Sequence, residues 1–191
     1  MKKVPEFSRY RREIVRVLGE NLRGNRWKIA ELGVQCGSLS YWILQSFPTA
    51  RLYGVDSYAE PDPQSAYCQT GDPCALVGDS ERREWKRQAE QVLLEFHLRF
   101  TLVVKDTKEA VKLFEPDSFD AVIVDADHSF AGVTTDSFAW WPVLKDGGLM
   151  LWHDYGGPAH TAGVKPAVNQ FCESVGRRPV VEDYLVAWVR K

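Results

Sequence analysis

The sequence lacks the features that mark several classes of protein. Its four cysteines form no CxxC pair and no metal-finger spacing, so we expect free thiols rather than a zinc finger or a disulfide framework. No apolar run approaches the roughly 20 residues of a membrane span, and the basic N-terminus has no apolar signal core. A net charge of −2 gives no electrostatic reason for binding nucleic acid or an anionic membrane. We therefore expect a cytoplasmic protein.

What the sequence does contain fits one globular domain over residues 1–191. The composition, 45% hydrophobic and 26% charged, is ordinary for a folded chain that forms a single core. Residues 5–22, in an N-terminal segment that we place at 1–24, have the periodicity of an amphipathic helix. Residues 57–79 show no periodicity and are rich in proline and glycine. A loop this long is usually functional or mobile, so we expect a lid, an oligomer contact or a flexible insertion.

Two apolar runs in the second half of the chain end on polar side chains. Residues 121–124 and 149–152 read as buried strands of a parallel sheet, and a helix-length segment separates them. The side chains that follow these runs are Asp125, Asp127 and His128 after the first, and His153 and Asp154 after the second. Because parallel strands end at the same edge of a sheet, where ligands of such folds bind, we expect these acids and imidazoles to meet there.

A glycine-containing turn follows the first predicted strand, residues 28–32. The pattern is E-x-G-x-x-x-G, formed by Glu31, Gly33 and Gly37. Glycine lets the backbone turn sharply and approach a ligand, and Ser38 is placed to cap the helix that follows. A dinucleotide-binding fold would have another glycine where this chain has Gln35, which argues against a pyrophosphate ligand.

Two further predicted strands, residues 51–55 and 100–104, lead to acids at the same edge. Asp56 lies about twenty residues after the glycine turn, where nucleotide-binding folds place an acid on ribose hydroxyls; the alternative is a simple turn residue. Asp106 is placed either to accept a hydrogen bond from an adenine amino group or to begin a helix. We expect Thr107 to cap that helix.

Together these motifs resemble the class I S-adenosylmethionine-dependent methyltransferases, above all small bacterial ones. The likeness also rests on D-x-D-H-S at residues 125–129, W-W-P-x-L at 140–144, G-G at 147–148 and H-D-Y at 153–155. It implies an α/β fold: a doubly wound, Rossmann-like and mostly parallel sheet of seven strands in the order 3-2-1-4-5-7-6. Helices would cover both faces, and the chain would end in an antiparallel hairpin.

The resemblance also implies a site for S-adenosylmethionine. Glu31, Gly33 and Gly37, followed by Ser38, match the loop whose backbone packs against the methionine part. Asp56 matches the acid on the ribose hydroxyls, and Asp106 the position near adenine, with Thr107 beside it. Asp125 matches the acid next to the reactive methyl group. In the related catechol-type and macrolide-sugar O-methyltransferases that acid helps to hold a divalent cation. Those relatives have an acid-rich pair where this chain has His153 and Asp154.

The chemistry leaves two ways to remove the proton of an attacking hydroxyl. In the first, Asp125, His153 and Asp154 hold a divalent cation that lowers the pKa of the hydroxyl. Carboxylates alone suit Mg²⁺, whereas His153 or His128 would favour Mn²⁺ or Fe²⁺. In the second, no metal is bound and His128 is the base, because its ordinary pKa lies near neutrality. His153 is then structural.

Three functions follow as hypotheses. The first is an S-adenosylmethionine-dependent enzyme that methylates a hydroxyl of a small-molecule acceptor, with catalytic residues Asp125, His128, His153 and Asp154. The second is a nucleotide-binding oxidoreductase, against which Gln35 argues. The third is an interaction module that kept cofactor binding without turnover. The expected partners are a small-molecule acceptor and a second copy of the chain in a homodimer.

Overall fold

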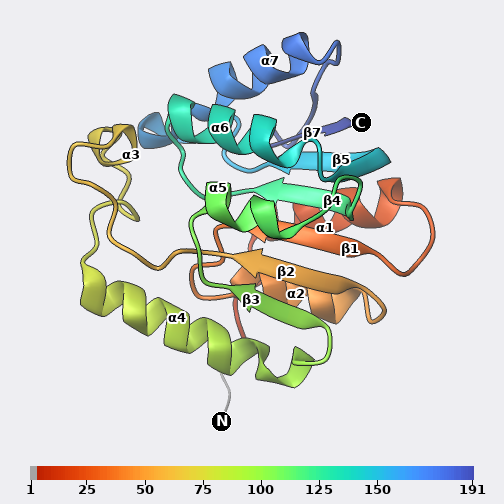
Figure 1. Cartoon of the computed structure of the whole chain (residues 1–191), viewed down its shortest axis with the longest axis horizontal. Coiled ribbons are helices and arrows are strands. Elements are labelled where there is room, and N and C mark those ends of the chain that lie inside the picture. The colour runs from red at the N-terminus through yellow and green to blue at the C-terminus, as the bar shows by residue number, and fades with distance from the viewer. Residues whose placement is uncertain (1–3) are drawn as a thin grey trace.

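The structure is a computed structural model that describes residues 4–191, and it is built around one sheet. The strands lie in the order β3-β2-β1-β4-β5-β7-β6 (Figure 1). The first five are parallel, whereas β7 runs antiparallel to both β5 and β6. The predicted order and terminal hairpin are therefore confirmed. The strands are β1 (Lys28–Leu32), β2 (Arg51–Val55), β3 (Phe100–Val103), β4 (Phe119–Val124), β5 (Leu144–Trp152), β6 (Val180–Glu182) and β7 (Val186–Arg190).

Helices cover both faces of the sheet and form two separate buried clusters. One cluster joins the sheet to α1 (Arg9–Asn21), α2 (Ser38–Ser46) and α4 (Asp79–Leu93). The other joins it to α5 (Thr107–Ala110), α6 (Phe130–Trp140) and α7 (Val164–Ser174). The remaining elements are α3 (Ala66–Gln69) and three 3₁₀ turns, η1 (Leu94–Phe96), η2 (Val111–Leu113) and η3 (Ala159–Thr161). Within residues 4–191 no helix is long and apolar enough to cross a membrane.

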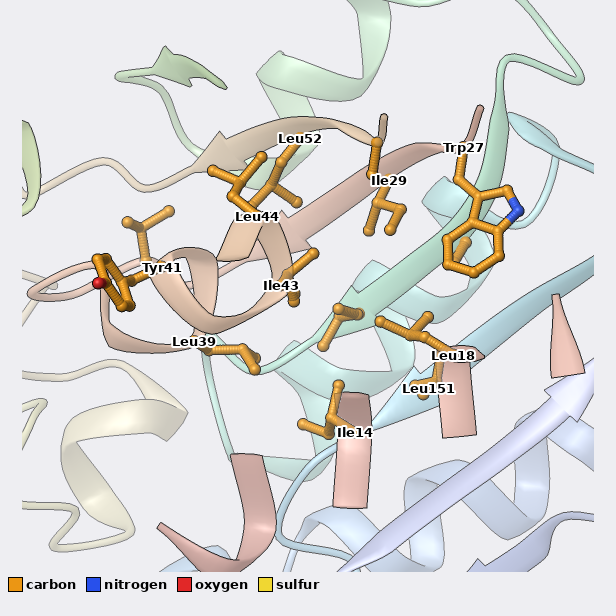
Figure 2. Close-up of a cluster of buried hydrophobic side chains, with 14 of the residues drawn as sticks. Ile14, Leu18, Trp27, Ile29, Leu39, Tyr41, Ile43, Leu44, Leu52 and Leu151 are labelled. Atoms are coloured by element: carbon orange, nitrogen blue, oxygen red, sulfur yellow. The ribbon is translucent and has the colours of Figure 1, made fainter. Parts of the chain in front are cut away.

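The N-terminal helix packs against the sheet. Figure 2 shows Ile14 and Leu18 of α1 among the apolar side chains of α2 and of the strands, including Leu151 of β5. The helix begins at Arg9 rather than at the predicted residue 5. The segment before it contacts α2, where the indole of Trp42 donates a hydrogen bond to the carbonyl of Pro5 at 3.1 Å. The predicted segment thus divides into a short irregular stretch before residue 9 and a helix that buries one face, with Ile14, Val17 and Leu18.

Two predicted helix caps are wrong. Ser38 is the first residue of α2, and the capping position belongs to Gly37, whose φ of 77° ends the preceding turn in the left-handed region. Thr107 is likewise inside α5, because Asp106 stands before it and accepts a hydrogen bond from the backbone N–H of Lys108 at 2.9 Å. An aspartate is at least as good a cap as a threonine. The Thr107 hydroxyl is therefore free to donate to Asp136, at 2.6 Å.

The segment of residues 57–79 is folded back onto the domain. It leaves β2, forms α3 close to α6 and returns to α4 at the side of the sheet toward which the parallel strands point (Figure 1). The guanidinium of Arg82, on α4, is buried and donates hydrogen bonds to three backbone carbonyls of the segment: Cys74 at 2.7 Å, Ala75 at 3.3 Å and Val77 at 3.1 Å. Its position beside the strand ends makes this segment one wall of the cavity described next.

Candidate active site

A cavity of about 890 Å³ lies at the carboxyl ends of the parallel strands. It is lined by residues from the ends of β1, β2, β4 and β5, from the 57–79 segment and from α6. Open α/β sheets bind their ligands at this edge. Most of the predicted site residues line the cavity: Glu31, Gly33, Asp56, Asp106, Thr107, Asp125, His128, His153 and Asp154. Gly37 and Ser38 do not line it.

Four of these side chains form one cluster. Asp125, His128, His153 and Asp154 each offer one ligand atom, and all four atoms lie within 4.8 Å of one another. Ligand atoms about 2.1 Å from a cation would lie at most about 4.2 Å apart, so the cluster needs only a small contraction to enclose one. The structure thus brings together the two strand ends that the sequence placed at a common edge.

The imidazoles of the cluster lie between the two carboxylates. His153 Nδ1 lies 2.8 Å from Asp154 Oδ2 and 3.1 Å from Asp125 Oδ1. His128 Nε2 lies 3.3 Å from the same oxygen of Asp125 and 3.5 Å from Asp154 Oδ2. Each carboxylate therefore contacts both rings. One nitrogen of each ring, His128 Nε2 and His153 Nδ1, faces the two carboxylates.

The carboxylates change the acidity of both rings. Burial alone would lower the pKa of His128, but hydrogen bonds to Asp125 and Asp72 outweigh it and raise the pKa to about 10. Burial opposes the charge of His153 in the same way, and Asp125 and Asp154 raise its pKa to about 9. In return, the rings hold the pKa of Asp125 well below its ordinary value despite its burial. In the metal-free protein the cluster is thus held together by charge.

The backbone at the end of β5 is shaped to present these groups. Asp154 has a φ of 58°, in the left-handed region that aspartate tolerates better than most residues. The ring of His153 packs on that of Tyr10, from α1, at a centroid distance of 4.4 Å. His153 Nε2 is buried and has no hydrogen-bond partner among the described residues, so the ring makes its polar contacts through Nδ1 alone.

A residue that sequence reasoning missed completes this arrangement. The carboxylate of Asp72, in the 57–79 segment, lies 2.6 Å from His128 Nδ1, the ring nitrogen that faces away from the cluster. Asp72 is only 2% exposed. It lies 56 residues before His128 along the chain, and no local pattern in the sequence connects the two.

The glycine turn holds the cluster close to the rest of the cavity. Gly33 has a φ of 88°, and a Cβ atom there would lie 2.0 Å from the backbone oxygen of Asp125. Gly37 serves packing instead, because its Cβ would lie 2.9 Å from Leu93 on α4. Glu31 is buried and accepts a hydrogen bond from the hydroxyl of Ser40. Burial raises the pKa of Glu31 to about 8.

The acid after β2 binds the glycine turn. Asp56 Oδ2 accepts hydrogen bonds from the backbone N–H groups of Val34, at 3.0 Å, and Gln35, at 2.9 Å. Its Oδ1 accepts one from Tyr58, at 2.8 Å. A carboxylate has about four acceptor sites, so about one remains for a ligand. The alternative reading of Asp56 as a turn residue is thus part of its role, and ribose binding stays a prediction.

Two acids near the predicted adenine position, Asp106 and Asp136, have different roles. One oxygen of Asp106 caps α5, as described above. Thr107 and Asp136, whose hydroxyl and carboxylate are hydrogen bonded, both line the cavity. Burial raises the pKa of Asp136 to about 7, so this carboxyl is a second polar group in this part of the cavity. It was absent from the sequence prediction because its position within α6 carries no motif.

The chemistry of the cluster fits a divalent cation. Two carboxylate oxygens and two imidazole nitrogens converge, and a buried carboxylate holds one ring from behind, as is usual for metal-binding histidines. The donor set is richer in nitrogen than the oxygen-only sites that Mg²⁺ prefers, so it favours metals such as Mn²⁺ or Fe²⁺. His128 belongs to the cluster geometrically, whereas the sequence analysis had left it open as either a metal ligand or a base without metal.

Comparison with known proteins agrees with this geometry. The model of a protein family described as a methyltransferase domain matches residues 30–155. No curated protein matches the chain in sequence. Among solved structures, the chain resembles the O-methyltransferase TomG from Streptomyces achromogenes in complex with S-adenosylmethionine, with a TM-score of 0.62, 14% identity and coverage of 100% of this chain and 83% of TomG.

Two further structures have the same fold. The O-methyltransferase NovP gives a TM-score of 0.64 at 18% identity, with 95% of this chain and 78% of NovP covered. A methyltransferase from Podospora anserina bound to S-adenosylhomocysteine gives 0.63 at 12% identity, with 97% and 79% covered. At such identities the likeness establishes the fold.

Proposed function

Because the chain belongs to the methyltransferase-domain family, whose model covers residues 30–155, we propose that it transfers the methyl group of S-adenosylmethionine to a hydroxyl oxygen of a small molecule. The observation that carries this proposal is the cluster of Asp125, His128, His153 and Asp154 at the carboxyl edge of the sheet, in the same cavity as the glycine turn. Two of the similar structures are O-methyltransferases, and two hold S-adenosylmethionine or S-adenosylhomocysteine.

The reaction is an in-line displacement. The bond from the methyl carbon to the sulfonium sulfur breaks as the bond from that carbon to the acceptor oxygen forms, and sulfur takes the electron pair. The acceptor hydroxyl gives its proton to solvent water, and S-adenosylhomocysteine is released. Since no group of the protein enters a covalent bond, orientation of the two reactants supplies most of the acceleration. The wall formed by residues 57–79 helps to exclude water from the methyl group.

The cluster would assist the removal of the proton from the acceptor hydroxyl. Asp125 Oδ1, Asp154 Oδ2, His128 Nε2 and His153 Nδ1 are the atoms that would hold a divalent cation. When bound, such a cation would coordinate the acceptor oxygen and lower the pKa of its hydroxyl. The competing reading, His128 as a base without metal, is weakened by its raised pKa of about 10. A ring that already carries both protons at neutral pH cannot accept another.

Calorimetry and activity measurements together test the proposal. Titration with S-adenosylhomocysteine should show one binding site per chain, and titration with Mn²⁺ should show a second, independent one. Asp125→Asn and Asp154→Asn should each abolish Mn²⁺ binding and methyl transfer to a panel of hydroxylated acceptors. Asp146→Asn, at an exposed position of β5, is the matched control and should behave as wild type.

The outcomes separate the alternatives. Absence of heat with S-adenosylhomocysteine would overturn the cofactor assignment. Methyl transfer that survives a chelator would overturn the metal and support His128 as the base. Binding of both ligands without transfer to any acceptor of the panel would favour the non-catalytic interaction module.

A further inference from the structure

We propose that Asp72 is a positioning residue for His128, and that the 57–79 segment is therefore a part of the active site rather than an inserted loop. The effect of Asp72 on cation binding rests on the proposed function, because it assumes that the site binds a cation. The orientation of the His128 ring, by contrast, can be measured without any ligand.

The geometry pairs the two residues closely. Asp72 Oδ2 lies 2.6 Å from His128 Nδ1. The other oxygen of Asp72 accepts a hydrogen bond from the backbone N–H of Cys74 at 2.8 Å. His128 is the one side chain among residues 4–191 that forms an ion pair with Asp72. A carboxylate that is 2% exposed is costly to bury unless it is paired, so the imidazole compensates for its burial.

This contact decides which nitrogen of His128 keeps its proton when the ring is neutral. A carboxylate can only accept, so the ring must donate from Nδ1. The other nitrogen, Nε2, then faces Asp125 and Asp154, and in the neutral ring it carries the lone pair. A metal ligand needs that lone pair, and a carboxylate behind the ring is the usual device that fixes the tautomer.

The segment that carries Asp72 is held from two sides. Arg82 of α4 binds the carbonyl of Cys74, two residues beyond Asp72, at 2.7 Å. The side-chain amide of Gln35, in the glycine turn, donates to the sulfur of Cys74 at 3.3 Å. Thr70 Oγ1 accepts a hydrogen bond from the backbone N–H of Asp72 itself at 3.1 Å. The position of the carboxylate is therefore set by the glycine turn and α4 together.

The alternative is that Asp72 has only a structural role, as a turn residue. Asp62, in the same segment, makes the same kind of turn contact, accepting a hydrogen bond from the backbone N–H of Gln64 at 2.8 Å. Asp62 is exposed, and within residues 4–191 no hydrogen bond or ion pair joins it to a histidine. Asp72 differs in its burial and in its second oxygen, which makes Asp62→Asn a matched control for Asp72→Asn.

Nitrogen-15 NMR of the metal-free chain, labelled at histidine, tests the proposal directly. The His128 signals are assigned by their loss in His128→Gln. In wild type and in Asp62→Asn, Nε2 should be the nitrogen that loses its proton as the pH rises, and Nδ1 should keep its proton in the neutral ring. In Asp72→Asn, Nδ1 should lose its proton first instead, because the amide is no longer a charged acceptor and Nε2 still faces Asp125 and Asp154. A neutral wild-type ring with its proton on Nε2 would overturn the proposal, whether or not the variant folds.

A second measurement tests the consequence for the cation. Loss of a carboxylate behind a ligating histidine typically weakens metal binding about 10–100-fold, so Asp72→Asn should bind Mn²⁺ that much more weakly than wild type. Its affinity for S-adenosylhomocysteine should not change, which separates this effect from misfolding. Unchanged Mn²⁺ affinity would contradict the positioning role. If wild type itself bound no Mn²⁺, the metal part of the proposed function would fail and the NMR result would still decide the role of Asp72.

Discussion

At the scale of single residues, Gly33 sets the distance between the glycine turn and the acid at the end of β4. We predict that Gly33→Ala lowers the free energy of unfolding by about 3 kcal/mol or more. The substitution adds left-handed strain at a φ of 88° and places a Cβ 2.0 Å from the Asp125 carbonyl. Gly147 has a similar φ of 77° but open space around it, so Gly147→Ala should cost only about 1–2 kcal/mol. Urea unfolding measures both values, and equal losses would refute the close approach.

The histidine pair gives a prediction about pH. The pKa values of His128, about 10, and His153, about 9, lie above the ordinary 6.5, so both rings carry an extra proton at neutral pH. A cation can bind only after these protons leave. Binding of Mn²⁺ at pH 7 should therefore release about two protons, and the affinity should rise as pH increases toward 9. Calorimetry in buffers of different ionisation enthalpy counts the protons, and an absence of release would contradict this arrangement.

The same four residues show what the sequence could reveal at this scale. Asp125, His128, His153 and Asp154 directly follow apolar runs, so their meeting at one edge followed from the parallel sheet alone. Asp72 and Asp136 could not be found in this way. Asp72 reaches His128 through the folding of an irregular segment, and Asp136 meets Thr107 through helix packing. Neither contact leaves a trace in the local pattern.

At the scale of elements, the sequence located the helices better than their first residues. The Ser38 and Thr107 caps were wrong because a better residue stood one position earlier. Gly37 adopts a φ of 77°, and Asp106 has a carboxylate of suitable length. The choice depends on backbone conformation, which the residue types alone leave open. The same uncertainty placed the start of α1 at residue 5, where the chain instead contacts Trp42.

The 57–79 segment depends on one buried guanidinium. We predict that Arg82→Met increases amide hydrogen exchange within residues 70–78 while leaving the exchange of β1 and β4 unchanged. The carbonyls of Cys74 and Val77 lose their Arg82 donor, and that of Ala75 keeps only the weak Cys68 thiol at 3.8 Å. Each unpaired buried group costs about 1–3 kcal/mol. Arg83→Met is the control, because Arg83 is exposed and makes only a 3.6 Å ion pair with Asp79. Equal protection in both variants would show that the segment does not depend on Arg82.

At the scale of the whole molecule, alternating apolar runs and helical segments predicted an α/β sheet with mostly parallel strands, and the resemblance to class I methyltransferases implied the order of those strands. The central strands β1 and β4 are buried on both faces and lie in the middle of the order. The cavity was less predictable. Its lining comes from many separate parts of the chain, and one of them, residues 57–79, has no periodicity.

Because the cofactor would bind only the folded chain, it should stabilise the whole molecule. At about 100 times its dissociation constant, S-adenosylhomocysteine should add about 2.7 kcal/mol and raise the melting temperature by about 5–11 °C. Asp56→Asn should reduce this shift if the remaining acceptor site of Asp56 binds ribose, and it should also lower the melting temperature without ligand, because Asp56 holds Val34 and Gln35.

The control for Asp56→Asn is an acid with the same structural task at the opposite end of the sheet. Asp120 accepts a hydrogen bond from the backbone N–H of Lys28 at 2.7 Å and pairs with Lys145 at 2.7 Å. Asp120→Asn should lower the melting temperature of the free protein but leave the ligand-induced shift intact, because Asp120 lies away from the cavity. If both variants kept the full shift in differential scanning fluorimetry, Asp56 would act only on the fold, and the ribose would have to be held by other residues of the rim.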